Sequence, residues 1–220
     1  MERLILPDDI RTALQAAPFK QVVDLWQSVI ELFGARGKAA LGRADRFYLL
    51  TMLLNRVDAF HPWLYERCRE VEAQPDECLD LWSREHYKST IITYAGIIQE
   101  VLREPNITVA IFSHVRPIAT KFLGQIKYEL ETNEDLKTVY PDVLWADPKR
   151  DALRAGATWT QYRIDVKRTQ NPKEGTVEAW GLVDGQPTGA HFALRVYDDV
   201  VTRESVTTPE MVAKTTQAWE

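Results

Sequence analysis

The sequence Ile107-Thr108-Val109-Ala110-Ile111-Phe112 is rich in β-branched residues and is typical of a β-strand. Helical patterns lie on both sides of it. Residues 88–103 carry apolar side chains on more than one helical face, as a helix wedged between other elements does, and residues 116–132 carry them on one face. A short apolar run at residues 77–83 is predicted to be a strand. Strand, helix, strand and helix in this order predict an α/β protein with a mostly parallel sheet flanked by helices.

The remainder of the second half is predicted to add strands to this sheet. Residues 142–157 have no periodic pattern and are predicted to be a loop. Three β-like runs follow, at residues 161–167, 176–183 and 192–197. Thr207-Thr208-Pro209-Glu210 has the form of a capping box, in which Thr207 would cap a helix and Glu210 would bond back to it, so a helix is predicted to begin there.

The N-terminal part is helical in pattern. An apolar stripe begins near residue 22 and is predicted to end at Gly34, and a second stripe covers residues 47–57. A third, shorter helix is predicted to start near Pro62. We therefore expect an N-terminal helical segment at residues 1–58 and an α/β core at residues 59–220.

Composition narrows the class of protein. The chain has 220 residues, of which 45% are hydrophobic, enough to bury a sizeable core. Its formal net charge of −5 argues against coating nucleic acid by bulk charge, so any DNA contact would be local or transient. Neither a membrane span nor a signal peptide is expected, and Cys68 and Cys78 lack metal-ligand spacing. An intracellular protein, located in the cytoplasm and without a membrane partner, is predicted.

The sequence Ser83-Arg84-Glu85-His86-Tyr87-Lys88-Ser89-Thr90 lies between a predicted strand and a predicted helix. A phosphate-binding loop needs inward-facing amides at a helix N-terminus, a lysine for the phosphates and a hydroxyl for Mg²⁺. Lys88 and Ser89 supply the two side chains. Trp82 and Tyr87, however, stand where the usual pattern has glycine. An ordinary helix cap is the alternative interpretation.

A second candidate feature closes the last predicted strand, where Asp198-Asp199 follow Phe192–Tyr197. Carboxylates in this place can hold the water shell of a metal and orient an attacking water. Two acids at a strand end can also form a turn or a cap. Because the lysine loop and the acid pair both follow strands, a parallel sheet would bring both to its carboxyl edge, where ligands bind.

These features together resemble the large terminase subunits of tailed bacteriophages, the ATP-driven motors that package DNA. Their loop keeps an early arginine and a late Lys-[Ser/Thr]-Thr, as residues 83–90 do. Two further segments also resemble this family: Phe60-His61-Pro62-Trp63 and Gly181-Leu182-Val183-Asp184-Gly185-Gln186-Pro187-Thr188-Gly189. The resemblance covers residues 60–220 and implies a P-loop NTPase fold of the additional-strand type.

The resemblance also implies roles for individual residues. All eight residues of the 83–90 loop would bind the nucleotide, with Lys88 on the β- and γ-phosphates and Ser89 on Mg²⁺. Arg84 would contact the γ-phosphate or sense its loss. Asp198 would be the Walker B carboxylate that holds the metal, and Asp199 would take the place of the catalytic glutamate. The Phe60-His61-Pro62-Trp63 segment would contact adenine or pack in the core.

The function implied is ATP hydrolysis with Mg²⁺ that drives double-stranded DNA into a capsid. The implied partners are DNA, a portal protein, a small terminase subunit and further copies of the chain in a homo-oligomeric ring. The place implied is the host cytoplasm, at the procapsid portal. Relatives have a further core strand with a coupling motif and a nuclease domain, so we expect this sequence to be the N-terminal part of a longer protein.

Two departures from the family pattern stand out. Tyr87 replaces the glycine before the lysine, where a positive φ would be costly for a residue with a side chain. No arginine lies between Thr169 and Leu194, where a trans-acting arginine finger would be sought. The sequence does not choose among the remaining candidates, which are Arg150, Arg154, Arg163, Arg168 and Arg195.

Two other functions fit the same residues. A metal-dependent nuclease or phosphatase would use Asp184, His191, Asp198 and Asp199, since carboxylates can hold two metals for phosphodiester cleavage. A non-catalytic fragment would bind nucleotide, or only dock onto portal and terminase partners.

Overall fold

The computed structural model describes residues 3–74, 78–83, 85–183 and 189–218. The chain divides into two compact units. Unit 1 comprises Met1–Arg103 and Asn133–Pro141, and unit 2 comprises Glu104–Thr132 and Asp142–Glu220. The boundary predicted between residues 58 and 59 falls inside unit 1.

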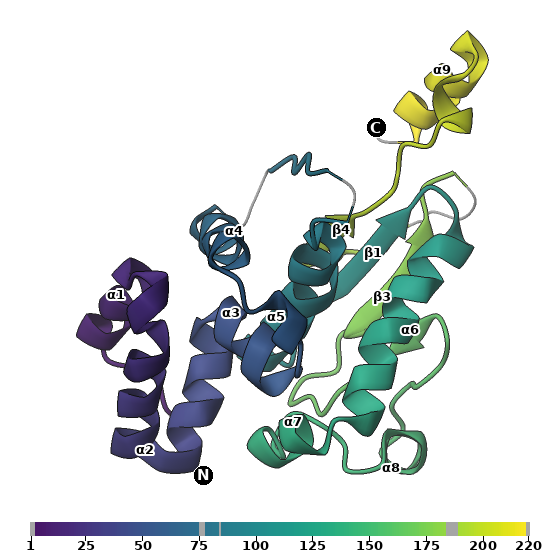
Figure 1. The fold of residues 1–220 in the computed structure, drawn as a ribbon. Helices are drawn as coiled ribbons and strands as arrows, with labels where there is room; N and C mark the ends of the chain where they lie inside the picture. The colour runs from purple at the N-terminus through teal and green to yellow at the C-terminus, as the bar shows by residue number, and fades with distance from the viewer. Residues whose placement is uncertain (1–2, 75–77, 84, 184–188, 219–220) are drawn as a thin grey trace. The chain divides into compact units, whose positions relative to one another are not determined.

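Unit 2 contains a four-stranded sheet with the order β2-β3-β1-β4 (Figure 1). The strands are β1 (Val109–Ser113), β2 (Arg163–Ile164), β3 (Val177–Gly181) and β4 (Leu194–Tyr197). Strand β1 pairs in parallel with β3 and with β4, while β2 pairs antiparallel with β3. The predicted α/β class with a mostly parallel sheet is therefore confirmed.

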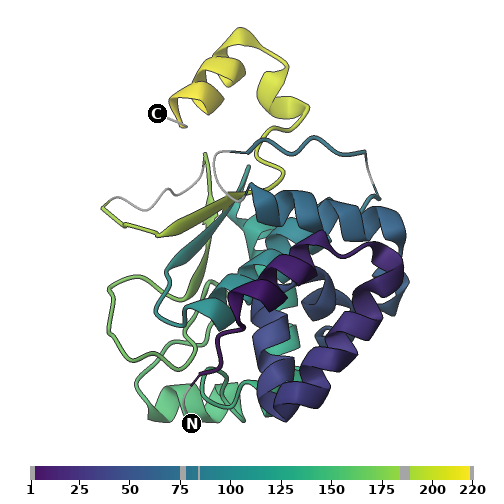
Figure 2. The ribbon, with the colours of Figure 1, turned by 90° about the vertical axis from the view of Figure 1, so that its left-hand side faces the viewer.

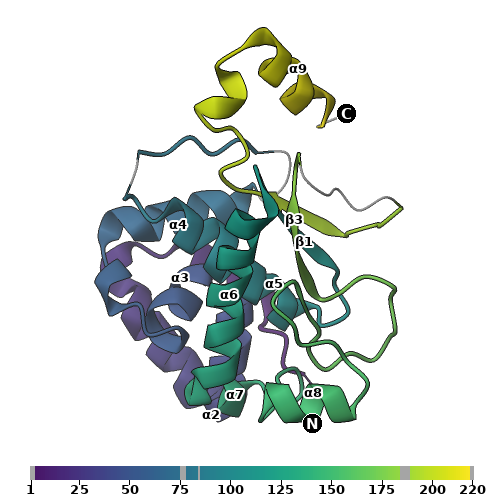
Figure 3. The same cartoon turned by 90° about the vertical axis from the view of Figure 1, so that its right-hand side faces the viewer.

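Helix α6 (Arg116–Thr132) packs along β1 and β3 (Figure 3). Its bounds are those predicted from the apolar stripe. One face of the helix is buried through Ala119, Leu123, Ile126 and Leu130. All five residues of β1 are buried too, as expected for the β-branched run at the centre of a parallel sheet.

Two predictions for local structure are wrong. Residues 78–83 form no strand, and residues 75–77 lie outside the described part of the chain. Leu79 and Leu81 are each 83% exposed, because within the described residues no neighbouring strand pairs with this segment. The second error is the predicted loop at residues 142–157, which contains the helix α8 (Pro148–Arg154). Its start signal is local, since Asp147 accepts a hydrogen bond from the Arg150 amide, and Pro148 takes the first helical position.

The C-terminal part of unit 2 contains the short helix η5 (Glu204–Val206) and the helix α9 (Pro209–Gln217). The predicted helix start is confirmed with a shift of one residue. Thr208, not Thr207, is the cap, and its hydroxyl accepts a hydrogen bond from the Met211 amide at 3.3 Å. Pro209 follows as the first helical residue, which needs no amide donor.

Unit 1 is helical (Figure 2). Its elements are α1 (Asp8–Ala16), η1 (Phe19–Gln21), α2 (Val22–Ala44), α3 (Arg46–Tyr48), η2 (Leu49–Leu53), η3 (Val57–Ala59), α4 (Pro62–Ala73), η4 (Thr90–Gly96), α5 (Ile97–Arg103) and α7 (Glu134–Val139). Lys88 and Ser89 are helical as well, so residues 88–103 form the continuous helix predicted, with a π-helical stretch at η4. The helix predicted to start near Pro62 is confirmed as α4.

The two other N-terminal helices differ from the prediction at their ends. The chain breaks its helical path at Gly34, where φ is 58° and ψ is −136°, and then continues as a helix to Ala44. The break was predicted, whereas the continuation was not. The second stripe ends at Leu53 and not at residue 57, because Asn55 takes a left-handed conformation with φ of 52°.

In the parts of the chain that the structure describes, no helix is both long enough and apolar enough to cross a bilayer.

Candidate functional site

The predicted phosphate-binding loop makes a tight turn into a helix. Glu85 has a φ of 65° and Tyr87 a φ of 62°, both in the left-handed region that non-glycine residues rarely adopt. The Tyr87 carbonyl accepts a hydrogen bond from the Ile91 amide at 2.8 Å, so Lys88 and Ser89 occupy the first turn of the helix. Arg84 lies outside the described residues. The loop thus adopts left-handed turns without the glycines that usually allow them.

The segment Phe60-His61-Pro62-Trp63 forms the start of α4 and contacts the loop. His61 caps the helix, because its Nδ1 accepts a hydrogen bond from the Trp63 amide at 3.1 Å. The Trp63 ring meets Trp82 at a centroid distance of 6.0 Å and His86 at 5.5 Å, both nearly edge to face. Two segments predicted to belong to one site therefore touch within unit 1.

The predicted acid pair follows β4 in unit 2. Asp198 is 2% exposed, and its amide donates to the Phe112 carbonyl at 2.9 Å. Asp199 is exposed with a φ of 52°, and its carbonyl accepts from the His114 amide at 3.1 Å. The chain therefore turns sharply between a buried carboxyl group and an exposed one at the carboxyl edge of the sheet.

Two residues at this edge were not predicted. Ser113 is the last residue of β1, the strand next to β4, and His114 follows it. The pairing of Phe112 with Tyr197 brings Ser113 level with Asp198. Ser113 Oγ and His114 Nδ1 are buried without a hydrogen-bond partner among the described residues. Such atoms are costly to bury unless something satisfies them. The sequence signal that could have found them is a polar Ser-His pair directly after the strand predicted at residues 107–112.

Ser113→Ala is expected not to lower the free energy of unfolding, because no hydrogen bond is lost and a buried hydroxyl without a partner is removed. Thr176→Ala is the matched control. The Thr176 hydroxyl is buried and accepts from the Val166 amide at 3.1 Å and from Arg168 Nε at 2.8 Å. Its removal is expected to cost about 1–3 kcal/mol. Urea denaturation of both variants measures the difference, and equal losses would contradict the account of Ser113.

Each unit carries an oxygen donor of a type that Mg²⁺ can use. Among the described residues, no group of three or more His, Cys, Asp or Glu side chains is placed to hold a metal. Mg²⁺ at nucleotide sites needs only one or two protein oxygens, with water and phosphate oxygens completing its shell. In unit 2 the buried carboxyl group of Asp198 is such a donor, and in unit 1 the hydroxyl of Ser89 is another.

The structure describes three of the four residues of the nuclease alternative, which are His191, Asp198 and Asp199. Asp184 lies outside the described residues. His191 is exposed, and its amide donates to Glu174 Oε1 at 3.0 Å. A two-metal centre needs several ligands in one place, and the described residues do not assemble one around Asp198 and Asp199.

No protein-family model matches this chain, and no curated protein matches it either.

The candidate arginines separate into two groups. Arg163 and Arg168 both bond to buried Asp165, at 3.2 Å and 3.5 Å, and Arg168 also donates to the Glu174 carbonyl at 2.8 Å. These two side chains stabilise the loop beside β3. The other three candidates, Arg150, Arg154 and Arg195, are exposed.

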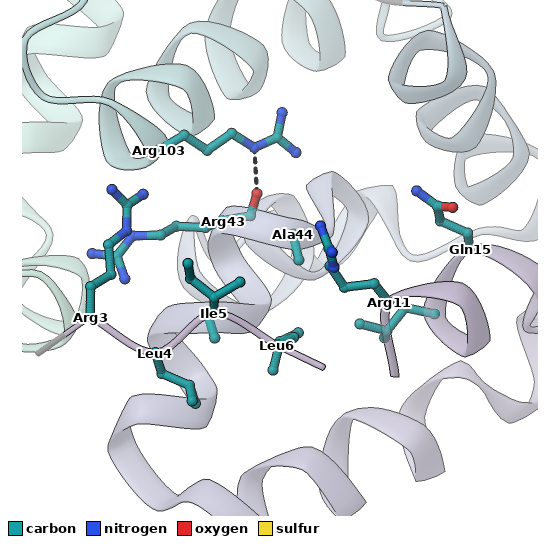
Figure 4. A pocket seen from close by; sticks show the side chains of 11 residues that line it. Arg3, Leu4, Ile5, Leu6, Arg11, Gln15, Arg43, Ala44 and Arg103 are labelled. Carbon is teal, nitrogen blue, oxygen red and sulfur yellow. Dashed lines mark hydrogen bonds between the residues drawn. The ribbon is translucent and has the colours of Figure 1, made fainter. Parts of the chain in front are cut away.

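A cavity of about 440 Å³ lies within unit 1, and none of the predicted site residues lines it (Figure 4). Three of the arginines that line it donate hydrogen bonds to carbonyls at helix ends, while Arg11 pairs with Asp8. Arg3 Nη2 and Arg43 Nε donate to the Leu102 carbonyl at 3.1 Å and 2.8 Å, and Arg103 Nε donates to the Arg43 carbonyl. These contacts satisfy carbonyls at helix ends, so a packing role accounts for Arg3, Arg43 and Arg103.

Proposed function

We propose that this chain is the ATPase region of a viral DNA-packaging terminase motor. In this proposal it binds ATP with Mg²⁺ and hydrolyses it to drive double-stranded DNA into a capsid. The fold would be a P-loop NTPase of the additional-strand type. The observation that carries the proposal is the loop before Lys88, with two left-handed residues and a lysine and a hydroxyl in the first turn of the following helix.

The loop has the chemistry that phosphate binding requires. Amides at the start of a helix point outward along its axis and attract anions. Lys88 would reach the β- and γ-phosphates, and the Ser89 hydroxyl would bind the ion that accompanies them. Arg84 enters the proposal through the motif alone, as the residue that contacts the γ-phosphate.

The acid pair would complete the reaction. Buried Asp198 would hold the water shell of Mg²⁺, and exposed Asp199 would orient a water toward the γ-phosphorus. The ion supplies charge stabilisation for the phosphoryl group when it is bound. Since phosphoryl transfer needs little covalent help from the protein, positioning by these groups would provide most of the catalysis.

The partners proposed follow from the motor function. They are double-stranded DNA, a portal protein, a small terminase subunit and other copies of the chain in a ring. The net charge of −5 favours local and transient contacts with DNA over nonspecific electrostatic binding by the whole surface.

Lys88→Ala tests the proposal. The wild-type protein is expected to bind Mg·ATP, and the variant is expected to bind it about 10- to 100-fold more weakly, since one charge-assisted contact with the phosphates is lost. Isothermal titration calorimetry with a non-hydrolysable ATP analogue measures this affinity. Phosphate release from ATP measures turnover, which is expected to fall as well.

Lys38→Ala is the control, since Lys38 is an exposed lysine on α2 in the same unit. It is expected to bind like the wild type. Unchanged affinity in Lys88→Ala would exclude the proposed site. A nucleotide-dependent rise in melting temperature without turnover would indicate the non-catalytic alternative. ATP-independent DNA cleavage lost in Asp198→Ala would indicate the nuclease.

A further inference from the structure

Tyr87 is the most unusual residue of the loop, because it holds a conformation suited to glycine. Its φ of 62° brings Cβ close to the backbone, a cost that glycine does not have. The residue stands directly before Lys88, where the common phosphate-loop pattern has glycine. Some interaction must therefore stabilise this conformation in place of a smaller residue.

The Tyr87 side chain is bound to a preformed ion pair. Its hydroxyl donates a hydrogen bond to Asp58 Oδ2. Arg56 donates two hydrogen bonds to the same carboxylate, from Nε at 3.0 Å and from Nη2 at 2.8 Å. The Arg56 guanidinium also lies 5.5 Å from the centre of the Tyr87 ring. We call these three residues the Arg56–Asp58–Tyr87 clasp.

The anchor of the clasp belongs to a different segment from the loop. Arg56 and Asp58 flank Val57 at the short helix η3. Asp58 lies 29 positions before Tyr87 in the sequence. Because Arg56 and Asp58 are two residues apart, their pairing does not depend on Tyr87. The loop is thus tied to a separate part of unit 1 at the residue whose backbone is strained.

We propose that the Arg56–Asp58–Tyr87 clasp positions the phosphate-binding loop by holding Tyr87 in the left-handed conformation that glycine would otherwise provide. Tyr87 and Asp58 are positioning residues in this scheme. The consequence for nucleotide affinity rests on the proposed function, whereas the effect on the loop itself does not.

The charges of the clasp are suited to this role at neutral pH. Hydrogen bonds from Arg56 and Tyr87 hold the pKa of Asp58 well below its usual range, and the bond to Asp58 raises the pKa of Tyr87. Because the pKa of Asp58 is lowered, the stabilisation that its ionised carboxylate provides is fully present at pH values above the pKa of this group in the unfolded chain. It is lost only as the pH falls through the lowered value, so the clasp stays closed across the neutral range.

The clasp is expected to act on the loop rather than on global stability. The Asp58 side chain is 49% exposed, and exposed ion pairs contribute little to folding. A change in the conformation of residues 85–88, on the other hand, would move the amides that precede Lys88. Loss of the hydrogen bond between Tyr87 and Asp58 should therefore change phosphate binding and the hydrogen exchange of the loop amides without unfolding the protein.

A mutant cycle between Asp58 and Tyr87 tests the proposal. Asp58→Ala is expected to weaken binding of a non-hydrolysable ATP analogue about 5- to 30-fold, the factor that corresponds to the cost of an unsupported left-handed residue. Tyr87→Gly, whatever its own affinity, provides the second background of the cycle. In the Tyr87→Gly background, Asp58→Ala is expected to have no further effect, because glycine needs no support.

Hydrogen exchange of the apo protein provides a readout independent of nucleotide. Asp58→Ala is expected to speed exchange of the amides at residues 85–88 and to leave α2 unchanged. Glu70→Ala is the matched control, since it removes an exposed ion pair with Arg67 on α4 of the same unit. It is expected to change neither exchange at the loop nor nucleotide affinity.

The outcomes separate the clasp from the proposed function. If the wild type binds no nucleotide but Asp58→Ala speeds loop exchange, the proposed function fails and the clasp stands. If Asp58→Ala leaves loop exchange unchanged, the clasp is overturned whatever the nucleotide affinity. An equal loss of affinity on Asp58→Ala in the wild-type and Tyr87→Gly backgrounds would also overturn it.

Discussion

Replacement of Asp45 by alanine is expected to lower the free energy of unfolding by about 3–5 kcal/mol, the range for breaking a buried ion pair. Asp45 is fully buried before α3. Its carboxylate accepts hydrogen bonds from Trp26 Nε1 at 2.8 Å, from Arg69 Nη2 at 2.8 Å and from the Tyr48 amide at 3.0 Å. Alanine would leave the half-buried Arg69 guanidinium and two further donors without this acceptor.

Urea denaturation of the full chain, followed by tryptophan fluorescence and circular dichroism, measures the loss. Asp45→Asn separates the charge from the hydrogen bonds, because its amide oxygen can still cap α3 at the Tyr48 amide. A smaller loss than for alanine is expected. Thr208→Ala, which removes the cap of α9, provides the scale for an isolated cap at about 1 kcal/mol. An Asp45→Ala loss no larger than that would contradict the role of the buried carboxylate.

The sequence predicted the elements whose signals are local. The β-branched run at β1 and the single apolar face of α6 each carry their pattern within a few residues, and both were found in place. Residues 77–83 have a similar apolar composition and were predicted as a strand. A strand also needs a neighbouring strand, which no local pattern reveals, and residues 78–83 join none of the strands that the structure describes.

In the candidate site, too, features with a local sequence signal were predicted, and features that depend on distant residues were not. The loop before Lys88 and the acids after β4 were recognised because their spacing is short. Chirality makes a positive φ at Tyr87 costly, which set Tyr87 apart from the family pattern, and the structure nevertheless has a positive φ there. Its partner Asp58 was not foreseen, because the bond joins residues 29 positions apart. Ser113 and His114 became notable only when the strand register placed them beside the acid pair.

Asp199→Asn is expected to bind Mg·ATP within about twofold of the wild type and to lose hydrolysis by about 10²- to 10⁴-fold, the usual contribution of a general base. Asparagine has the same shape as aspartate and also tolerates the left-handed region. The φ of 52° and the bond from the His114 amide to the carbonyl of residue 199 should therefore persist. Only the carboxylate that would orient the water is lost.

Single-turnover hydrolysis and analogue binding, measured on the same protein, test this separation of binding from chemistry. Asp199→Ala provides the contrast, because alanine tolerates the left-handed conformation less well and should disturb the turn at the carboxyl edge of the sheet. Asp198→Asn should instead weaken the dependence of binding on Mg²⁺, since Asp198 is the buried carboxyl group proposed to hold its water shell. If Asp199→Asn hydrolyses ATP at the wild-type rate, another group must orient the water. Ser113 and His114, whose buried polar atoms lie at the same edge, would then be the next residues to replace.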